Sequence, residues 1–347
     1  MGKSIDVSLY EKAYMMELDR VFPLTPNHHL HTIFFGGGTP SLMPPSLTEK
    51  IIQKAKTLWH HAENLEITLE ANPSTAEIER FQQFKNAGIN RLSIGIQSFD
   101  EQALTFLGRN HDANEGIKAI ELAQKIFDRV SFDLIYARPN QTLKEWEKEL
   151  SFAFQFGTSH LSLYQLTIEP GTAFAPRYDR GEIILPDEEL SVDLYLATLD
   201  MTERKNLPYY EVSNFSQVRQ ESQHNLIYWR YQEYVGIGPG AHGRYYKQDQ
   251  KIATEQHRAP DMWLKHVLEN YNGDHRVTTI SPIEQERERL MMGLRLREGV
   301  GITDETIPHD RLDMLKQQGD IIFKNNHMAL TTQGMLRLNG ILRYLLQ

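Results

Sequence analysis

The sequence predicts an α/β protein built on a parallel sheet, and three features of its 347 residues support that fold class. Short apolar segments alternate with amphipathic helical segments, which is the pattern of βαβ units. The apolar residues 33–35 run directly into Gly36-Gly37-Gly38-Thr39-Pro40, a sharp turn after an expected strand. Polar side chains follow several expected strands, where a β/α barrel places its ligand site. We therefore expect a partial β/α barrel.

The first half of the chain carries the expected barrel elements in alternation. An amphipathic helix over residues 4–21 comes first and ends before two prolines. The expected strands are short and apolar, and they cover residues 32–35, 66–71, 91–96, 130–136 and 160–165. The expected helices between them cover residues 47–59, 75–87, 113–127 and 143–156. Units of this kind join parallel strands through right-handed crossovers.

The second half of the chain is less regular. We expect an irregular segment over residues 170–186, a helix with acidic residues in its first turn up to residue 205, and a short strand and turn over residues 209–215. Residues 234–243 indicate a strand with a glycine turn. No helix carrying Lys-Ser or Lys-Thr follows them, so they do not form a phosphate-binding P-loop.

The last part of the chain resembles a winged helix. Its expected elements are helices over residues 284–296 and 310–318, a hairpin of residues 321–323 and 328–330, and a final helix to residue 346. We therefore expect three parts, namely a partial barrel over 1–170, an α+β extension over 171–280 and a winged-helix-like domain over 281–347. Because the chain is acidic, the last part is interpreted as a substrate-covering or partner-docking module rather than a DNA-binding one.

Composition narrows the class of protein. The chain is 40% hydrophobic and 24% charged, with a net charge of −9, which argues against a nucleic-acid-binding surface as its main function. It shows no signal peptide and no apolar stretch long enough to span a bilayer, so we expect a cytoplasmic protein with at most peripheral membrane association. It contains no cysteine, so these residues offer no disulfide, thiolate nucleophile or thiolate-ligated cluster.

Four polar residues follow the expected strands. They are a carboxylate, an amide, a guanidinium and a second carboxylate, at Glu70, Gln97, Arg109 and Asp133. Taken singly, the two acids fit helix caps, the amide fits a turn, and the arginine fits a solvated charge. Together at one rim they predict a site for a small polar ligand that carries a carboxylate and hydroxyl groups.

Three segments carry a family resemblance. Residues 35–40 (FGGGTP), 90–99 (NRLSIGIQSF) and 133–136 (DLIY) resemble the radical S-adenosylmethionine proteins of the oxygen-independent coproporphyrinogen III oxidase group. The likeness runs from about residue 30 to the end of the chain. Within this group, residues 223–229 (QHNLIYW) are similar to the HNxxYW motif of the HemW-type haem chaperones, which distinguishes the chaperones from the oxidases.

The resemblance implies a partial radical S-adenosylmethionine barrel and a role for each matching residue. Arg109 would pair with the carboxylate of S-adenosylmethionine, Gln97 and Asp133 would bind its ribose hydroxyls, and Glu70 would support its methionyl or ribose part. Gly37, Gly38 and Thr39 would hold its amino end. His224 would contact haem, against the alternative of a hydrogen-bonded structural histidine, and His242 is a weaker candidate on a loop near the substrate.

The chain departs from the family pattern in two places. The CxxxCxxC segment that ligates a 4Fe–4S cluster is absent along with the first barrel strand, so this chain cannot hold the expected cluster or carry out radical chemistry through its own thiolates. Either the sequence is a truncated copy, as its abrupt start favours, or it is a natural cluster-free descendant. Ala137-Arg138 stands where the family has Gly-Leu, and Arg138 would either disturb the strand end or touch a propionate.

Three functions fit these patterns. The first is a HemW-type chaperone that binds haem and S-adenosylmethionine and delivers haem to apo-proteins. The second is an oxygen-independent coproporphyrinogen III oxidase of porphyrin biosynthesis, which needs the absent cysteines. The third is a cluster-free binding protein. The pairs His29/His31 and His60/His61 lack the spacing of a metal site and are interpreted as surface histidines.

Overall fold

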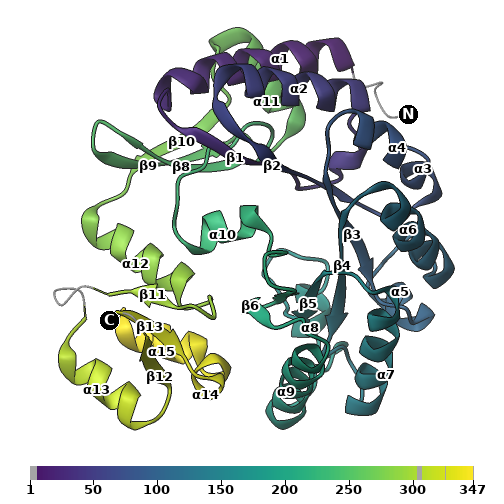
Figure 1. Ribbon diagram of the computed structural model, residues 1–347, viewed down its shortest axis with the longest axis vertical. Coiled ribbons are helices and arrows are strands. Elements are labelled where there is room, and N and C mark those ends of the chain that lie inside the picture. Colours follow the sequence, from purple (N-terminus) through teal and green to yellow (C-terminus); the bar gives the residue numbers. More distant parts are fainter. Residues whose placement is uncertain (1–5, 303–306, 325, 347) are drawn as a thin grey trace. The chain divides into compact units, whose positions relative to one another are not determined.

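Figure 1 shows the computed structural model of the chain, which describes residues 6–302, 307–324 and 326–346. The chain divides into two compact units. Unit 1 comprises Met1–Thr68, Gln83–Ile89 and Ser222–Gln347, and unit 2 comprises Leu69–Gln82 and Asn90–Glu221. Among the described residues, no helix is long and apolar enough to cross a membrane.

Unit 2 contains the central part of a curled parallel sheet. Its parallel strands are β3 (Arg91–Gln97), β4 (Arg129–Tyr136) and β5 (His160–Gln165), which pair in sequence order. The antiparallel strands β7 (Asn214–Ser216) and β6 (Tyr209–Glu211) extend the sheet beyond β5. The end of β2 (His60–Ala71) precedes β3 in the strand order. The predicted α/β class with a partial parallel barrel is thereby confirmed.

The helices of unit 2 begin where the sequence supplies capping groups. Asp112 and Glu115 form a capping box at α6 (Ala113–Ile126), and Thr142 and Glu145 do so at α7 (Leu143–Ala153). Helix α6 packs on β3 and β4 (Figure 1), and α7 packs on α9 (Glu188–Arg204). The remaining helices of the unit are short, and they are α3 (Thr75–Ile78), α5 (Glu101–Phe106), η3 (Phe154–Phe156) and α8 (Ala175–Asp179).

Unit 1 begins with α1 (Val7–Val21), which packs against α2 (Pro45–Leu58) and α11 (Pro260–Asn270). The fully buried Trp263 of α11 lies 4.9 Å from the ring of Tyr14, centroid to centroid. Strand β1 (His29–Phe35) is the neighbour of β2, and two 3₁₀ turns flank it, η1 (Phe22–Leu24) and η2 (Pro40–Leu42). A three-stranded antiparallel sheet follows later in the chain, formed by β8 (His242–Lys247), β9 (Gln250–Gln256) and β10 (Asp274–Thr279).

The C-terminal segment contains the predicted hairpin. Strands β12 (Ile321–Lys324) and β13 (His327–Leu330) pair antiparallel, and β11 (Val300–Gly301) pairs on the other side of β13. The helices of this segment are α12 (Pro282–Gly293), α13 (His309–Gln317), α14 (Thr332–Leu336) and α15 (Leu338–Leu345). Two predicted elements extend into residues outside the described ranges, the first helix at residues 4 and 5 and the hairpin turn at residue 325. The division into three parts stays a prediction.

Several predicted elements differ from the observed ones. The helix expected over 75–87 is interrupted, giving α3 and α4 (Phe81–Asn86), and the final helix is split into α14 and α15. The segment 170–186 contains α8, and α5 was not predicted. Residues 234–241 form no strand, although Tyr234 bridges Arg244 of β8. The strands β8 to β10 contain few apolar residues, although Tyr245 of β8 and Ile252 of β9 are buried.

Candidate functional site

The ends of β3 and β4 in unit 2 bring together two of the predicted polar residues. The amide Nε2 of Gln97 donates a hydrogen bond of 2.7 Å to Oδ2 of Asp133. The other carboxylate oxygen, Oδ1 of Asp133, is buried, and no described residue donates to it. A buried acceptor without a donor is costly, so this oxygen fits a ligand that supplies a hydroxyl or amine hydrogen.

Burial raises the pKa of Asp133 to about 6, above its ordinary value of 3.8. The nearby charge of Arg109 and the hydrogen bond from Gln97 lower this pKa, whereas the charge of Glu70 raises it. Three of the predicted residues of unit 2 therefore influence the carboxylate of the fourth, Asp133. At neutral pH Asp133 is ionised and can accept two hydrogen bonds, as a ribose diol requires.

Gln97 occupies a strained backbone position. Its φ angle is +69°, and the amide of Ser98 donates to the carbonyl of Ile96 over 2.9 Å, so these residues form a γ-turn of the rarer, positive-φ type. The β3–β4 register breaks between Ile94 and Gln97. A Cβ at Gly95 would lie 3.4 Å from Nε2 of Gln97, in van der Waals contact with the amide. Strain of this kind persists where surrounding contacts enforce it.

Arg138 contacts neither the strand-end carboxylate nor open solvent. Its Nη2 forms an ion pair of 2.7 Å with Oε2 of Glu149 on α7, and the two side chains are only 9% and 8% exposed. Its Nη1 donates to Oγ of Ser98. Strand β4 runs to Tyr136, two residues before Arg138, and the guanidinium turns to Glu149. Whether Arg138 disturbs the strand end or touches a propionate stays a prediction.

The glycine turn after β1 belongs to unit 1. Gly37 and Gly38 have φ angles of +78° and +57°, and no atom lies within 4 Å of the position of an added Cβ at either residue. Thr39 precedes the 3₁₀ turn η2, and its carbonyl accepts the amide of Leu42. The turn thus depends on glycine for its backbone conformation and leaves space beside it.

His224 lies on α10 (Gln223–Trp229) in unit 1, the helix formed by the HNxxYW motif. Its Nδ1 is 2.9 Å from the hydroxyl of Thr32, and its Nε2 is 2.8 Å from the hydroxyl of Tyr228. The ring stacks on Phe34 with centroids 4.5 Å apart. Glu66 accepts the backbone amide of His224, at 3.0 Å, and that of the preceding residue, which fixes the start of the helix. Both ring nitrogens are therefore hydrogen-bonded.

His242 is the exposed first residue of β8, and its backbone is paired with that of Glu255 on β9. Among the residues in the described ranges, no three His, Asp or Glu side chains are placed to hold a metal ion. His29 and His60, whose ring centroids lie 6.0 Å apart, belong to no such group of three.

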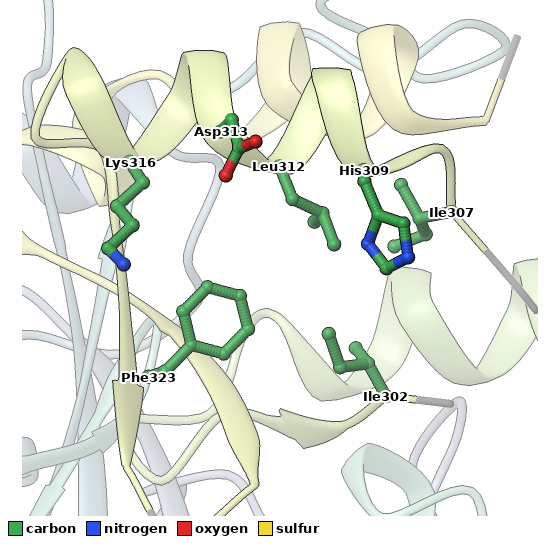
Figure 2. Close-up of a pocket in the computed structure, with 7 residues that line it drawn as sticks. All are labelled: Ile302, Ile307, His309, Leu312, Asp313, Lys316 and Phe323. Atoms are coloured by element: carbon green, nitrogen blue, oxygen red, sulfur yellow. The ribbon is translucent and has the colours of Figure 1, made fainter. Parts of the chain in front are cut away.

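A cavity of about 200 Å³ lies in the C-terminal segment (Figure 2). Apolar side chains and a few polar ones line it, and they are Ile302, Ile307, His309, Leu312, Asp313, Lys316 and Phe323. None of the predicted site residues is among them. This cavity therefore gives no support to the ligand site predicted from the strand ends.

The sequence did not identify the residues that hold the predicted site residues in place. Thr32, Phe34 and Tyr228 surround His224, and Ser98 and Glu149 stand behind Gln97. Ser98 lies in a segment of family resemblance, and Tyr228 is the tyrosine of HNxxYW, so both could have been identified from the sequence. Glu149 was not, because a glutamate on an amphipathic helix looks like any solvated charge.

Comparison with known proteins gives a consistent result. A profile described as the Radical SAM superfamily matches residues 6–153. A bovine protein named "Radical S-adenosyl methionine domain-containing protein 1, mitochondrial" is 32% identical, covering 99% of this chain and 82% of its own. "Heme chaperone HemW" of Escherichia coli (strain K12) is 34% identical, covering 97% and 89%.

Two further comparisons differ in coverage and in what they show. The chain spans only 65% of the zebrafish (Danio rerio) "Radical S-adenosyl methionine domain-containing protein 1, mitochondrial", with 36% identity over 82% of this chain. The solved structure of coproporphyrinogen III oxidase (HemN) from Escherichia coli matches with a TM-score of 0.78, covering 98% of this chain and 83% of that one. At 18% identity, this match shows a common fold and nothing finer.

Proposed function

The chain belongs to the radical S-adenosylmethionine superfamily, in the group that includes HemW and radical S-adenosyl methionine domain-containing protein 1, and on that premise we propose that it is a haem-binding chaperone. It binds S-adenosylmethionine at the ends of β3 and β4 and haem through His224, and it delivers haem to apo-proteins. The cytoplasmic location predicted from the sequence stays a prediction, since the related bovine and zebrafish proteins are named as mitochondrial.

The residues of unit 2 fit S-adenosylmethionine. The buried Oδ1 of Asp133 has no donor among the described residues and can accept a hydrogen bond from a ribose hydroxyl. The amide of Gln97 donates to the other oxygen, Oδ2. Arg109 is exposed and supplies positive charge for a carboxylate. Glu70 completes the set in unit 2. The role of Gly37, Gly38 and Thr39 at the amino group stays a prediction from the family resemblance. Bound S-adenosylmethionine supplies a reactive sulfonium centre.

The 4Fe–4S cluster of the superfamily does not fit these residues. Such clusters are held by cysteine thiolates, and the 347 residues contain no cysteine. The proposed function therefore comprises no radical step and no oxidation of coproporphyrinogen. Binding of haem and of S-adenosylmethionine needs no thiolate.

The observation that carries the haem proposal is the placement of His224. Its imidazole is fixed by stacking on Phe34 and by hydrogen bonds at both nitrogens. A neutral imidazole is a common ligand of haem iron. Because Nε2 is occupied by the hydroxyl of Tyr228, this hydroxyl has to move away before Nε2 can bind iron. Haem binding is thus coupled to a rearrangement on one helix.

The experiment is an absorption titration with haem of the wild-type chain, the variant His224→Ala and the control His61→Ala. His61 is an exposed histidine on β2, so its replacement reports on adventitious binding to surface imidazoles. We expect a saturable Soret shift in the wild type and the control that is lost in His224→Ala. Equal titrations of all three proteins would refute the assignment of His224.

Delivery is tested separately from binding. The haem-loaded chain is mixed with an apo-protein that has a distinct haem spectrum, such as an apo-cytochrome, and transfer is followed by the change of absorption. Loaded wild-type protein should transfer haem faster than free haem at the same concentration reconstitutes the acceptor. A chain that binds haem but retains it would be a haem-binding protein and not a chaperone.

A further inference from the structure

The γ-turn at Gln97 is held from behind by one buried carboxylate. Oε1 of Glu149 accepts the hydroxyl of Ser98 at 2.5 Å and the backbone amide of Phe99 at 2.8 Å. These are the two residues that follow Gln97, and Ser98 is fully buried. The same serine oxygen accepts the backbone amide of Asp100, at 3.1 Å. Glu149 thereby fixes the chain where it leaves the strained residue.

Arg138 supplies the positive charge that keeps this carboxylate in place. Its guanidinium pairs with Oε2 of Glu149 and donates to Ser98, so it joins both groups behind the turn. A buried carboxylate without a cation or sufficient donors is strongly disfavoured. Arg138 lies two residues after the end of β4, which carries Asp133, and follows Ala137, whose φ angle is +56°.

The ends of β3 and β4 are therefore linked twice. On one side the amide of Gln97 meets Asp133, and on the other Arg138 and Glu149 hold Ser98. The second link contributes no atom to the strand-end carboxylate. It restricts the backbone from which the Gln97 side chain projects, and strained conformations of this kind relax when the surrounding contacts are removed.

We propose that Arg138, acting through Glu149 and Ser98, is a positioning residue that holds the Gln97 amide against Asp133 and so prepares the site for a ribose diol. The proposal rests on the proposed function, because it names the groups that shape the S-adenosylmethionine site. It assigns a role to an arginine that the sequence alone left without one.

The test compares the wild type with Arg138→Met and with the double variant Arg138→Met/Glu149→Leu. The single variant leaves a buried carboxylate without its cation, whereas the double variant replaces both charged side chains by apolar ones and so leaves no uncompensated charge. Thr198→Val is the matched control, because it removes a buried hydrogen bond from Trp146 in the same unit without touching the turn. Melting temperature and S-adenosylmethionine affinity by calorimetry are measured for each.

We expect both Arg138 variants to bind S-adenosylmethionine about tenfold or more weakly than the wild type, the size expected when ligand binding has to impose a strained turn. Thr198→Val should lose stability but keep its affinity. Wild-type affinity in either folded Arg138 variant would overturn the proposal, since a purely structural ion pair would affect only the melting temperature.

A second readout does not depend on S-adenosylmethionine. The hydrogen bond from Gln97 lowers the pKa of Asp133, so its loss raises that pKa, which carbon-13 NMR of labelled aspartate follows. Gln97→Ala gives the reference shift, and the double variant should reproduce it. If the wild type binds no S-adenosylmethionine but the shift appears, the proposed function fails and the positioning role stands. If the wild type binds it and neither affinity nor pKa changes in the variant, the positioning role fails alone.

Discussion

The two candidate binding regions differ in how their polar groups are satisfied. At the ends of β3 and β4, one buried oxygen of Asp133 has no donor among the described residues. On α10, both nitrogens of His224 already have hydroxyl partners. The first region is organised for a ligand before the ligand arrives, at a cost to the free protein. The second is complete without a ligand, so binding there has to replace an internal hydrogen bond.

The largest effect is expected from Asp133→Ala. Two hydrogen bonds from ribose hydroxyls to a carboxylate would be lost, so affinity for S-adenosylmethionine should fall about 100-fold. The free energy of unfolding should change by less than about 1 kcal/mol, because removal of a desolvated carboxylate offsets the loss of the Gln97 bond. Calorimetric titration and thermal melting measure the two quantities. A large loss of stability with unchanged affinity would make Asp133 a structural residue.

His224→Ala should behave in the opposite way. Beyond its effect on haem, it removes the stack on Phe34 and the hydrogen bonds that the hydroxyls of Thr32 and Tyr228 form with the imidazole. We expect the haem-free protein to lose about 2 kcal/mol of unfolding free energy. Denaturant melts of the haem-free chain report this loss. Unchanged stability would show that the imidazole is not fixed as the structure has it.

The pKa of Asp133, raised to about 6 by burial, gives the strand-end region a pH dependence. Accepting two hydroxyls requires the ionised form, so affinity for S-adenosylmethionine should fall about fivefold from pH 6 to pH 5, and Asp133→Asn should show no such fall. Stability changes in the other direction. A pKa raised from 3.8 to about 6 stabilises the fold at acidic pH, and this contribution, about 3 kcal/mol at most, is lost as the pH rises through 6. A flat affinity profile in the wild type would contradict the role of the carboxylate.

The smallest effect is expected from Tyr228→Phe. The variant keeps the ring that lies against His224 but removes the hydroxyl that occupies Nε2. Since one hydrogen bond contributes about 0.5–1.5 kcal/mol, haem should bind about two- to tenfold more tightly. The comparison is a haem titration beside the wild type. Weaker binding would mean that the tyrosine assists haem binding instead of competing with it.

Much of the barrel could be read from the sequence because local pattern and fold agree there. The strands β3, β4 and β5 lie within one residue of the predicted bounds, since buried parallel strands are short apolar runs with helices between them. The strands β8 to β10 were not predicted, because they contain few apolar residues and so show little periodicity, although β8 and β9 form a hairpin. The break between α3 and α4 was also not predicted, because tertiary packing can override helix propensity.

The sequence by itself determined the α/β class, the family, and the residue types at the two candidate sites. The motifs name Gln97, Asp133 and His224, and the lack of cysteine excludes a thiolate-ligated cluster in these residues. Only the tertiary structure decided how each residue is held. The ion pair of Arg138 with Glu149, the strained turn at Gln97 and the hydroxyl partners of His224 join residues 4 to 192 positions apart. Contacts of this kind depend on which side chains the folded backbone brings within hydrogen-bonding distance, and no local pattern encodes that distance.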